Sequence, residues 1–374
     1  MVSFKRCSSW RRPLLCVATL WVAWVPFSVS SVLTLKPDAP TTYVVVKGDT
    51  LWDISALYLD SPWLWPRLWQ VNPDIDNPHL IYPGDKLNLI WRNGEPVLTV
   101  KPMHKLSPKV RKLDKQALPT LREEWVLPYL ESDLLLDESL LAESAKVIGS
   151  SNGLQYLTGQ QLLYITGQQV QGEWHIYRKM TTFTRDDKRV IALKKIAVAE
   201  SADEPAAPSD TDMTALKVRQ QTQEILAQDI ALPVREAQSD FSQRFYPQPS
   251  PKALDASILG SLEGSQYVGK HQVVVIDRGA RDALRQGSMF DLYQPGHKVA
   301  KAGQGVLARQ EVQQLPDVRI GHLMVIRPYQ DFSLALVTQS EQPIATETRL
   351  RSPLVTLKSA EDVVDAEQQG KEQG

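Results

Sequence analysis

A strand, a turn and a helix start are encoded within residues 43–54, and this stretch constrains the fold of the chain more than any other. Residues 43–47 form a β-branched run that predicts a strand. Gly48 and Asp49 supply the turn out of it. Thr50 can cap a helix that starts immediately, with Asp53 placed three residues later to face the exposed amides. The pattern therefore predicts a strand that leads directly into a helix.

A second helix and a closing strand follow. Pro66 suits the first position of a helix, and Pro73 prevents that helix from continuing beyond Asn72. Residues 74–79 are polar and predict a loop, and Pro83 with Gly84 has the order that a tight turn prefers. Residues 86–90 alternate as a strand does. Residues 43–90 are therefore expected to form a compact unit of strand, helix, helix and strand.

This unit resembles a LysM domain. The match lies in Tyr-Val-Val-Val-Lys-Gly-Asp-Thr-Leu-Trp-Asp-Ile from residue 43, in Asn72 and Pro73, and in Ile-Tyr-Pro-Gly-Asp-Lys-Leu from residue 81. LysM domains bind glycans that contain N-acetylglucosamine. The resemblance therefore implies a βααβ fold and a ligand in the glycan strands of peptidoglycan, with chitin as the less favoured ligand. It implies no reaction.

The resemblance also implies a place for the glycan, in a shallow groove between the loop after the first strand and the loop after the second helix. By matching positions, the glycan-binding residues are Gly48, Asp49, Thr50 and Leu51 on one side, Asn72, Pro73, Asp74 and Ile75 on the other, and Leu80 and Ile81 nearby. Backbone amides near a glycine can bond an acetamido carbonyl, and Leu51 or Ile75 can cover its methyl group. The alternative is that Gly48, Asp49 and Thr50 form only a turn and a helix cap, although one backbone can do both.

Tryptophan is unusually frequent in residues 61–69. Exposed indoles at Trp63 or Trp65 could stack on sugar rings. The favoured interpretation is that Trp52 and Trp69 fill a small core and that Trp63 or Trp65 packs the loop between the helices.

Residues 1–30 predict an export signal. Four basic residues precede an apolar run at 14–25, and small residues near Ser30 suit cleavage by a signal peptidase. If the apolar run extends to Leu33 or Leu35, it reaches the roughly 20 residues that span a bilayer, so an uncleaved membrane anchor is the alternative. Both interpretations place the body of the protein in the periplasm of a bacterium, with membrane contact only through this segment.

Charge and cysteine content exclude several functions. The chain has 42 Lys and Arg against 43 Asp and Glu, so it lacks the basic excess that draws proteins onto nucleic acid. Cys7 and Cys16 both lie in the predicted signal, which leaves the exported part without a disulfide or a thiol nucleophile. The histidines show no spacing typical of a zinc site. We expect no cofactor, no metal and no nucleic-acid partner.

The second half of the chain contains an internal repeat. Residues 148–165 align without gaps to 259–276, and residues 214–225 align to 333–344. Short β-branched and alternating runs predict strands in both copies. We predict two repeated small β barrels or sandwiches, at residues 146–235 and 256–352, that recruit an unidentified envelope protein.

The remaining segments complete the expected organisation. Clustered charges and prolines predict a solvated linker at residues 92–128, and polar composition predicts a disordered tail at residues 353–374. The fold class is then α+β, with a LysM-like module at residues 42–91 followed by the two β-rich modules.

Two functions remain open. The expected one is a non-catalytic peptidoglycan-binding anchor or scaffold of the cell envelope. The alternative is a glycan hydrolase with its site in the β-rich modules, because paired carboxylates for glycoside cleavage need only be about 5 to 10 Å apart in the fold.

Overall fold

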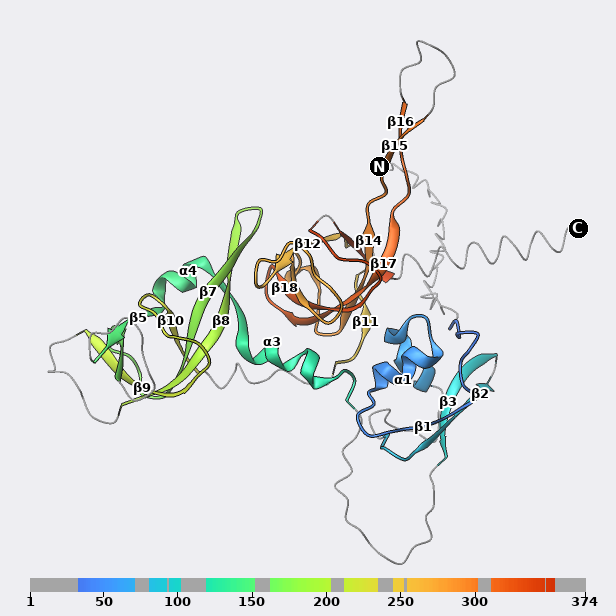
Figure 1. The fold of residues 1–374 in the computed structure, drawn as a ribbon, viewed down its shortest axis with the longest axis horizontal. Coiled ribbons are helices and arrows are strands. Elements are labelled where there is room, and N and C mark those ends of the chain that lie inside the picture. The colour runs from blue at the N-terminus through green and yellow to red at the C-terminus, as the bar shows by residue number, and fades with distance from the viewer. Residues whose placement is uncertain are drawn as a thin grey trace, which may run out of the picture. The chain divides into compact units, whose positions relative to one another are not determined.

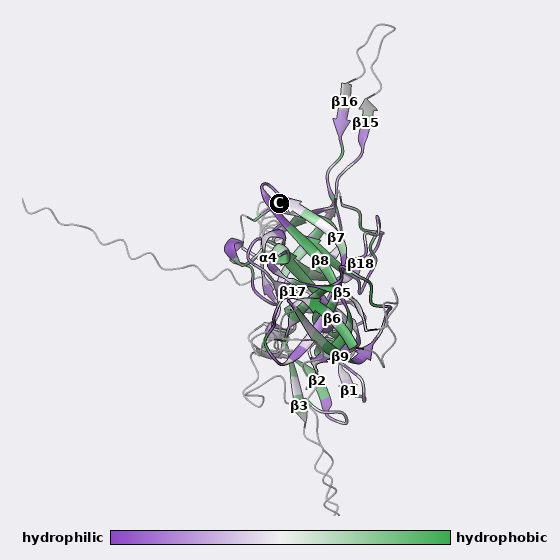
Figure 2. Ribbon diagram, turned by 90° about the vertical axis from the view of Figure 1, so that its left-hand side faces the viewer, coloured by the Kyte–Doolittle hydropathy of each residue, from purple (hydrophilic) through white to green (hydrophobic). Residues whose placement is uncertain are grey.

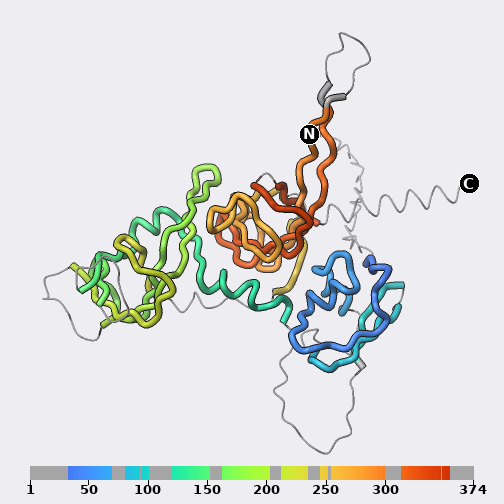
Figure 3. Tube along the Cα trace, viewed as in Figure 1, coloured from blue at the N-terminus to red at the C-terminus, as the bar shows by residue number. Residues whose placement is uncertain are grey.

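The computed structural model describes residues 33–70, 81–92, 94–101, 119–151, 162–202, 212–234, 245–251, 254–301, 311–346 and 348–353. The predicted export signal and all but the first residue of the predicted tail lie outside these residues. None of the helices in the described ranges has the length and apolar character needed to cross a membrane. Figure 3 follows the chain from the N-terminal module in blue, through a first barrel in green and yellow, to a second barrel in orange and red.

The N-terminal module is a three-stranded antiparallel sheet with two short helices (Figure 1). Strand β2 (Lys86–Arg92) lies between β1 (Thr42–Val44) and β3 (Glu95–Lys101). Between β1 and β2 the chain forms α1 (Leu51–Tyr58), the 3-10 turn η1 (Pro62–Leu64) and α2 (Trp65–Gln70). The expected order of strand, helix, helix and strand is confirmed, because apolar positions on both helices and on β2 are buried in one core.

Strand β3 corrects the predicted end of this module. Residues 92–128 were expected to form a solvated linker, but residues 95–101 pair with β2 along its whole length. Val97 and Leu98 have no exposed surface, and Gly94 turns the chain with a φ of +83°. The same range also contains η3 (Glu123–Trp125) and the start of α3 (Leu127–Ser132). The charges and prolines of the range dominated the sequence pattern, whereas its short apolar segments determine the structure.

The first barrel consists of six strands that close into a ring. They are β5 (Ala145–Ser150), β6 (Leu162–Thr166), β7 (Glu173–Arg185), β8 (Lys188–Ser201), β9 (Met213–Gln221) and β10 (Ile230–Pro233). The sheet order is β4-β8-β7-β10-β5-β6-β9, and the further pairing of β8 with β9 closes it. Strand β4 (Asp133–Asp137) extends the sheet from β8, and α4 (Glu138–Glu143) leads from β4 into β5.

The second barrel closes in the same manner. Its strands are β12 (Ala256–Ser261), β13 (Val273–Ile276), β14 (Ser288–Gln294), β17 (Val318–Pro328), β18 (Ser333–Ser340) and β19 (Arg349–Arg351). The order is β11-β14-β17-β18-β13-β12-β19, with β14 pairing β19 and with β11 (Gln248–Pro249) at the edge. A separate hairpin of β15 (Lys298–Lys301) and β16 (Glu311–Gln314) is inserted between β14 and β17. Figure 2 shows hydrophobic colouring along barrel strands such as β8 and hydrophilic colouring on β16.

The two rings share one pairing order. In both rings the first strand along the chain pairs with the second and the sixth: β5 with β6 and β10, and β12 with β13 and β19. The fifth strand pairs with the second and the fourth: β9 with β6 and β8, and β18 with β13 and β17. Each ring also has an irregularity at the same place in its first strand, between Val147 and Gly149 in one and between Ile258 and Gly260 in the other.

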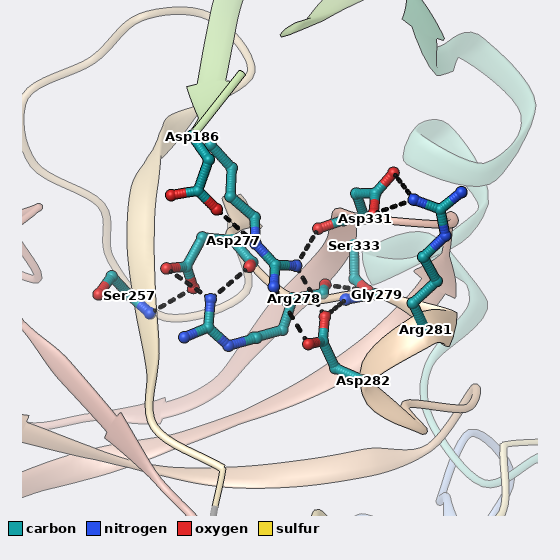
Figure 4. A network of polar contacts seen from close by, with 10 residues as sticks. Asp186, Ser257, Asp277, Arg278, Gly279, Arg281, Asp282, Asp331 and Ser333 are labelled. Carbon is teal, nitrogen blue, oxygen red and sulfur yellow. Dashed lines mark hydrogen bonds and ion pairs between the residues drawn. The ribbon is translucent and has the colours of Figure 1, made fainter. Parts of the chain in front are cut away.

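The end of the long β7–β8 hairpin contacts the second barrel. Arg185 donates to both carboxylate oxygens of Asp282, at 2.7 and 3.1 Å, and to the backbone carbonyl of Asp331 at 2.9 Å. Asp282 belongs to the 3-10 turn η5 (Ala280–Asp282), and the amide of Gly279 donates to the same carboxylate at 2.9 Å. Figure 4 shows Asp282, Asp331 and Arg281 gathered around this contact. A hairpin of the first barrel therefore ends in an ion pair with the second.

Candidate functional site

The turn between β1 and α1 is held by the carboxylate of Asp49. Its Oδ2 accepts hydrogen bonds from the Val46 amide at 2.8 Å and from the Tyr43 hydroxyl at 2.9 Å. Gly48 has a φ of +98°, in the left-handed region that glycine adopts without a steric cost. The Asp49 carboxylate thus positions the turn and leaves the exposed backbone around Gly48 to face solvent.

The Tyr43 hydroxyl is the donor in its contact with Asp49. Burial raises the pKa of the Tyr43 hydroxyl to about 12, and the hydrogen bond to Asp49 and its negative charge act in the same direction. The hydroxyl therefore remains a donor across the physiological range. The sequence pattern identified Tyr43 only as a strand residue, since its contact with Asp49 depends on the turn bringing the chain back.

Thr50 caps α1 as predicted. Its backbone is extended, with a φ of −121°, and its Oγ1 accepts from the Asp53 amide at 3.0 Å. The Thr50 hydroxyl in turn donates to the Asp53 carboxylate at 2.9 Å. The return contact of a capping box usually reaches the backbone of the cap residue, whereas here it reaches the side chain.

The next two amides of α1 are bonded to a distant part of the chain. The Leu51 amide donates to the Pro119 carbonyl at 3.0 Å, and the Trp52 amide donates to the Thr120 carbonyl at 3.1 Å. Thr50 is 1% exposed and Leu51 is fully buried. This contact could not be predicted, because no local pattern relates residues 119–120 to residues 51–52.

The part of the predicted groove that the structure describes is its first wall and Ile81. Gly48 is exposed, Asp49 is half-buried, and Thr50 and Leu51 are covered. Ile81 is fully buried in the core of the module. The remaining predicted residues, Asn72, Pro73, Asp74, Ile75 and Leu80, lie outside the described residues, so their part in the groove stays a prediction.

A second turn mirrors the first. Gly84 has a φ of +96°, and Asp85 Oδ2 accepts from the Tyr82 amide at 3.0 Å. The two turns are joined through Val45, whose amide donates to the Asp85 carbonyl at 2.9 Å and whose carbonyl accepts from the Gly84 amide at 2.8 Å. The repeated Gly-Asp pair at 48–49 and 84–85 is the sequence signal of this arrangement.

Four tryptophans of the module fill its core, whereas Trp91 on β2 is exposed. Trp52, Trp63, Trp65 and Trp69 are between 0 and 5% exposed. The ring of Trp65 also meets Tyr246 edge to face, with centroids 5.5 Å apart. The interpretation of these residues as core is confirmed, because indoles with so little exposed surface cannot stack on a sugar.

Comparison with known proteins agrees with this geometry. The family model described as LysM domain matches residues 43–89. The uncharacterized protein YqbP of Bacillus subtilis (strain 168) is 39% identical over 62 residues, which cover 14% of this chain and 28% of that protein. The match thus spans well under two thirds of this relative. Residues 43–89 therefore form a LysM domain, a family that binds glycans containing N-acetylglucosamine.

Proposed function

We propose that this chain is a non-catalytic peptidoglycan-binding protein of the bacterial envelope, held on the glycan strand by its LysM domain. The LysM match at residues 43–89 carries the proposal. The fold of the domain supports it, because the turn after β1 is already fixed in shape by Asp49 before any ligand arrives. A preformed turn reduces the ordering cost of binding a flexible sugar chain.

The binding chemistry follows from the groove residues. Exposed backbone around Gly48 offers amide and carbonyl groups to the acetamido and hydroxyl groups of the glycan. The second wall, at Asn72, Pro73, Asp74 and Ile75, contributes polar groups and an apolar contact for the acetamido methyl group. Binding of this kind holds the glycan without breaking it.

The barrels supply the scaffold. In this proposal they are two copies of one module, and the identical pairing order of their rings and the matched irregularities at Gly149 and Gly260 support that origin. The aligned residues 148–165 and 259–276 fall on the first two strands of each ring, which also supports it. The barrels recruit another envelope protein, and the export signal at residues 1–30 delivers the chain to the periplasm.

Co-sedimentation with purified peptidoglycan sacculi tests the proposal. The full chain is expected to pellet with sacculi. Asp49→Ala combined with Asn72→Ala removes the turn contact and one polar group of the second wall, so we expect affinity to fall about fivefold or more, equivalent to about 1 kcal/mol. Asp85→Ala removes the corresponding carboxylate from the second turn and serves as the matched control, with binding retained. A full chain that stays in the supernatant would refute the proposal.

A further inference from the structure

Residues 119–122 cross the start of α1, and we refer to them as the strap. The strap places the carbonyls of Pro119 and Thr120 against the amides of Leu51 and Trp52. Its next residue, Leu121, is 2% exposed and belongs to the same apolar core as the LysM helices. The strap therefore covers the Leu51 end of the predicted first wall, while Gly48 at the other end is exposed.

The strap offers the same chemical group as the glycan. An acetamido group binds through an amide carbonyl, and the strap presents amide carbonyls of its own backbone. The first amides of a helix have no partner within the helix, so each of them needs an acceptor from elsewhere. The strap fills this need at Leu51 and Trp52, and its own buried Leu121 side chain anchors it in the apolar core.

The polar side chains of the strap, at Thr120 and Arg122, add little to its hold on the domain. Its ion pair joins Arg122 Nε to Asp53 Oδ2 at 3.1 Å, with side chains that are 46% and 30% exposed. Pairs so open to solvent contribute little to stability. Thr120 is 1% exposed, and its buried hydroxyl has no hydrogen-bond partner among the described residues. A buried hydroxyl without a partner costs free energy that is recovered when the strap moves into water.

We infer that the strap is an internal competitor of the glycan, which occupies the Leu51 and Trp52 amides in the free protein and leaves when an N-acetylglucosamine chain binds there. This inference rests on the proposed function. Only molecules with an open strap can bind the glycan at Leu51 and Trp52. The apparent affinity for the glycan is therefore the intrinsic affinity multiplied by the fraction of molecules in which the strap is open. A change that opens the strap without touching the groove then tightens glycan binding.

Two measurements on the full chain test the inference. The probe is the pentamer of N-acetylglucosamine, titrated by calorimetry into the unchanged chain and into Arg122→Ala and Leu121→Ala. Amide hydrogen exchange at Leu51 and Trp52 reports the strap independently of any ligand. Arg189→Ala is the matched control, because Arg189 is 60% exposed and pairs with Glu138 at 3.6 Å in the first barrel.

The expected result is that Leu121→Ala exchanges faster at Leu51 and Trp52 and binds the pentamer at least about threefold tighter. Arg122→Ala is expected to change the exchange rate and the pentamer affinity in the same direction by a smaller factor. This variant still tests the inference if Leu121→Ala fails to fold. Arg189→Ala is expected to leave the exchange rate and the pentamer affinity unchanged. Binding that is unaltered or weaker in both strap variants would overturn the inference and leave the proposed function standing. Absence of binding in every protein would overturn both.

Discussion

Removing Arg185 is expected to loosen the contact between the two barrels. Its guanidinium makes two hydrogen bonds to Asp282, at 2.7 and 3.1 Å, and a third to the Asp331 carbonyl at 2.9 Å. The side chains of Arg185 and Asp282 are 22% and 17% exposed. Arg185→Ala leaves the Asp282 carboxylate in this partly buried place with the Gly279 amide as its remaining described donor.

The size of the effect follows from this exposure. Fully exposed pairs contribute about 0.2 to 1 kcal/mol, and breaking a buried pair costs about 3 to 5 kcal/mol. A bidentate pair of intermediate exposure lies between them, so we expect a coupling free energy of about 2 kcal/mol between Arg185 and Asp282. Burial acts to raise the pKa of Asp282, but the hydrogen bonds from Arg185 and Gly279 outweigh it and hold the pKa below the usual 3.8. The coupling is therefore present at neutral pH and disappears as the pH falls through this lowered pKa.

A double-mutant cycle in urea measures the coupling. Arg185→Ala, Asp282→Asn and the double variant are unfolded at pH 7 and followed by circular dichroism. The exposed pair Arg219 and Glu200, with side chains 57% and 50% exposed, is the matched control and is expected to couple by less than about 1 kcal/mol. Free energies of unfolding that add within about 0.5 kcal/mol for Arg185 and Asp282 would refute the reasoning.

Three further outcomes are expected. Trp69→Ala destabilises the LysM domain by about 3 to 5 kcal/mol in thermal unfolding, because Trp69 is 1% exposed, whereas Trp69→Phe costs less since the indole Nε1 has no partner among the described residues. Burial raises the pKa of Asp133 from 3.8 to about 6, with Glu263 adding to the rise and Lys194 and Arg327 opposing it. Between pH 3.8 and about 6, the Asp133 carboxyl is protonated in the folded state and ionised in the unfolded state, so the free energy of unfolding falls as the pH rises through this window. Asp133→Asn removes the ionisation, so it stabilises the protein by up to about 3 kcal/mol at pH 7.5 but not at pH 3. Incubation with sacculi releases no soluble muropeptides at any pH or with added metal ions, and release would favour the hydrolase alternative.

The LysM domain could be predicted because its signals are local. The β-branched run before Gly48, the Thr50 cap and the alternation after Lys86 each depend on residues a few positions apart. The structure places β1, α1 and β2 where these signals indicate, to within a few residues. The second helix begins at Trp65, one residue before the expected Pro66, after a 3-10 turn that starts at Pro62.

The strap and β3 could not be predicted in the same way. The contact between Leu51 and Pro119 joins residues far apart in the chain, and the residues on either side of it read only as charged or proline-rich. The closure of each barrel is likewise non-local. Strand β8, for example, pairs with β7 along most of its length on one side, and with β4 and then β9 on the other. Short alternating runs indicate strands, but they do not say which strands are neighbours.

An NMR titration with the N-acetylglucosamine pentamer tests the central claim most directly. The amides of the full chain are observed as the sugar is added. The account predicts saturable shifts concentrated at residues 48–52 and 72–75, with the barrel strands unaffected. Saturation with shifts confined to the barrels, or no shifts at millimolar sugar, would contradict it.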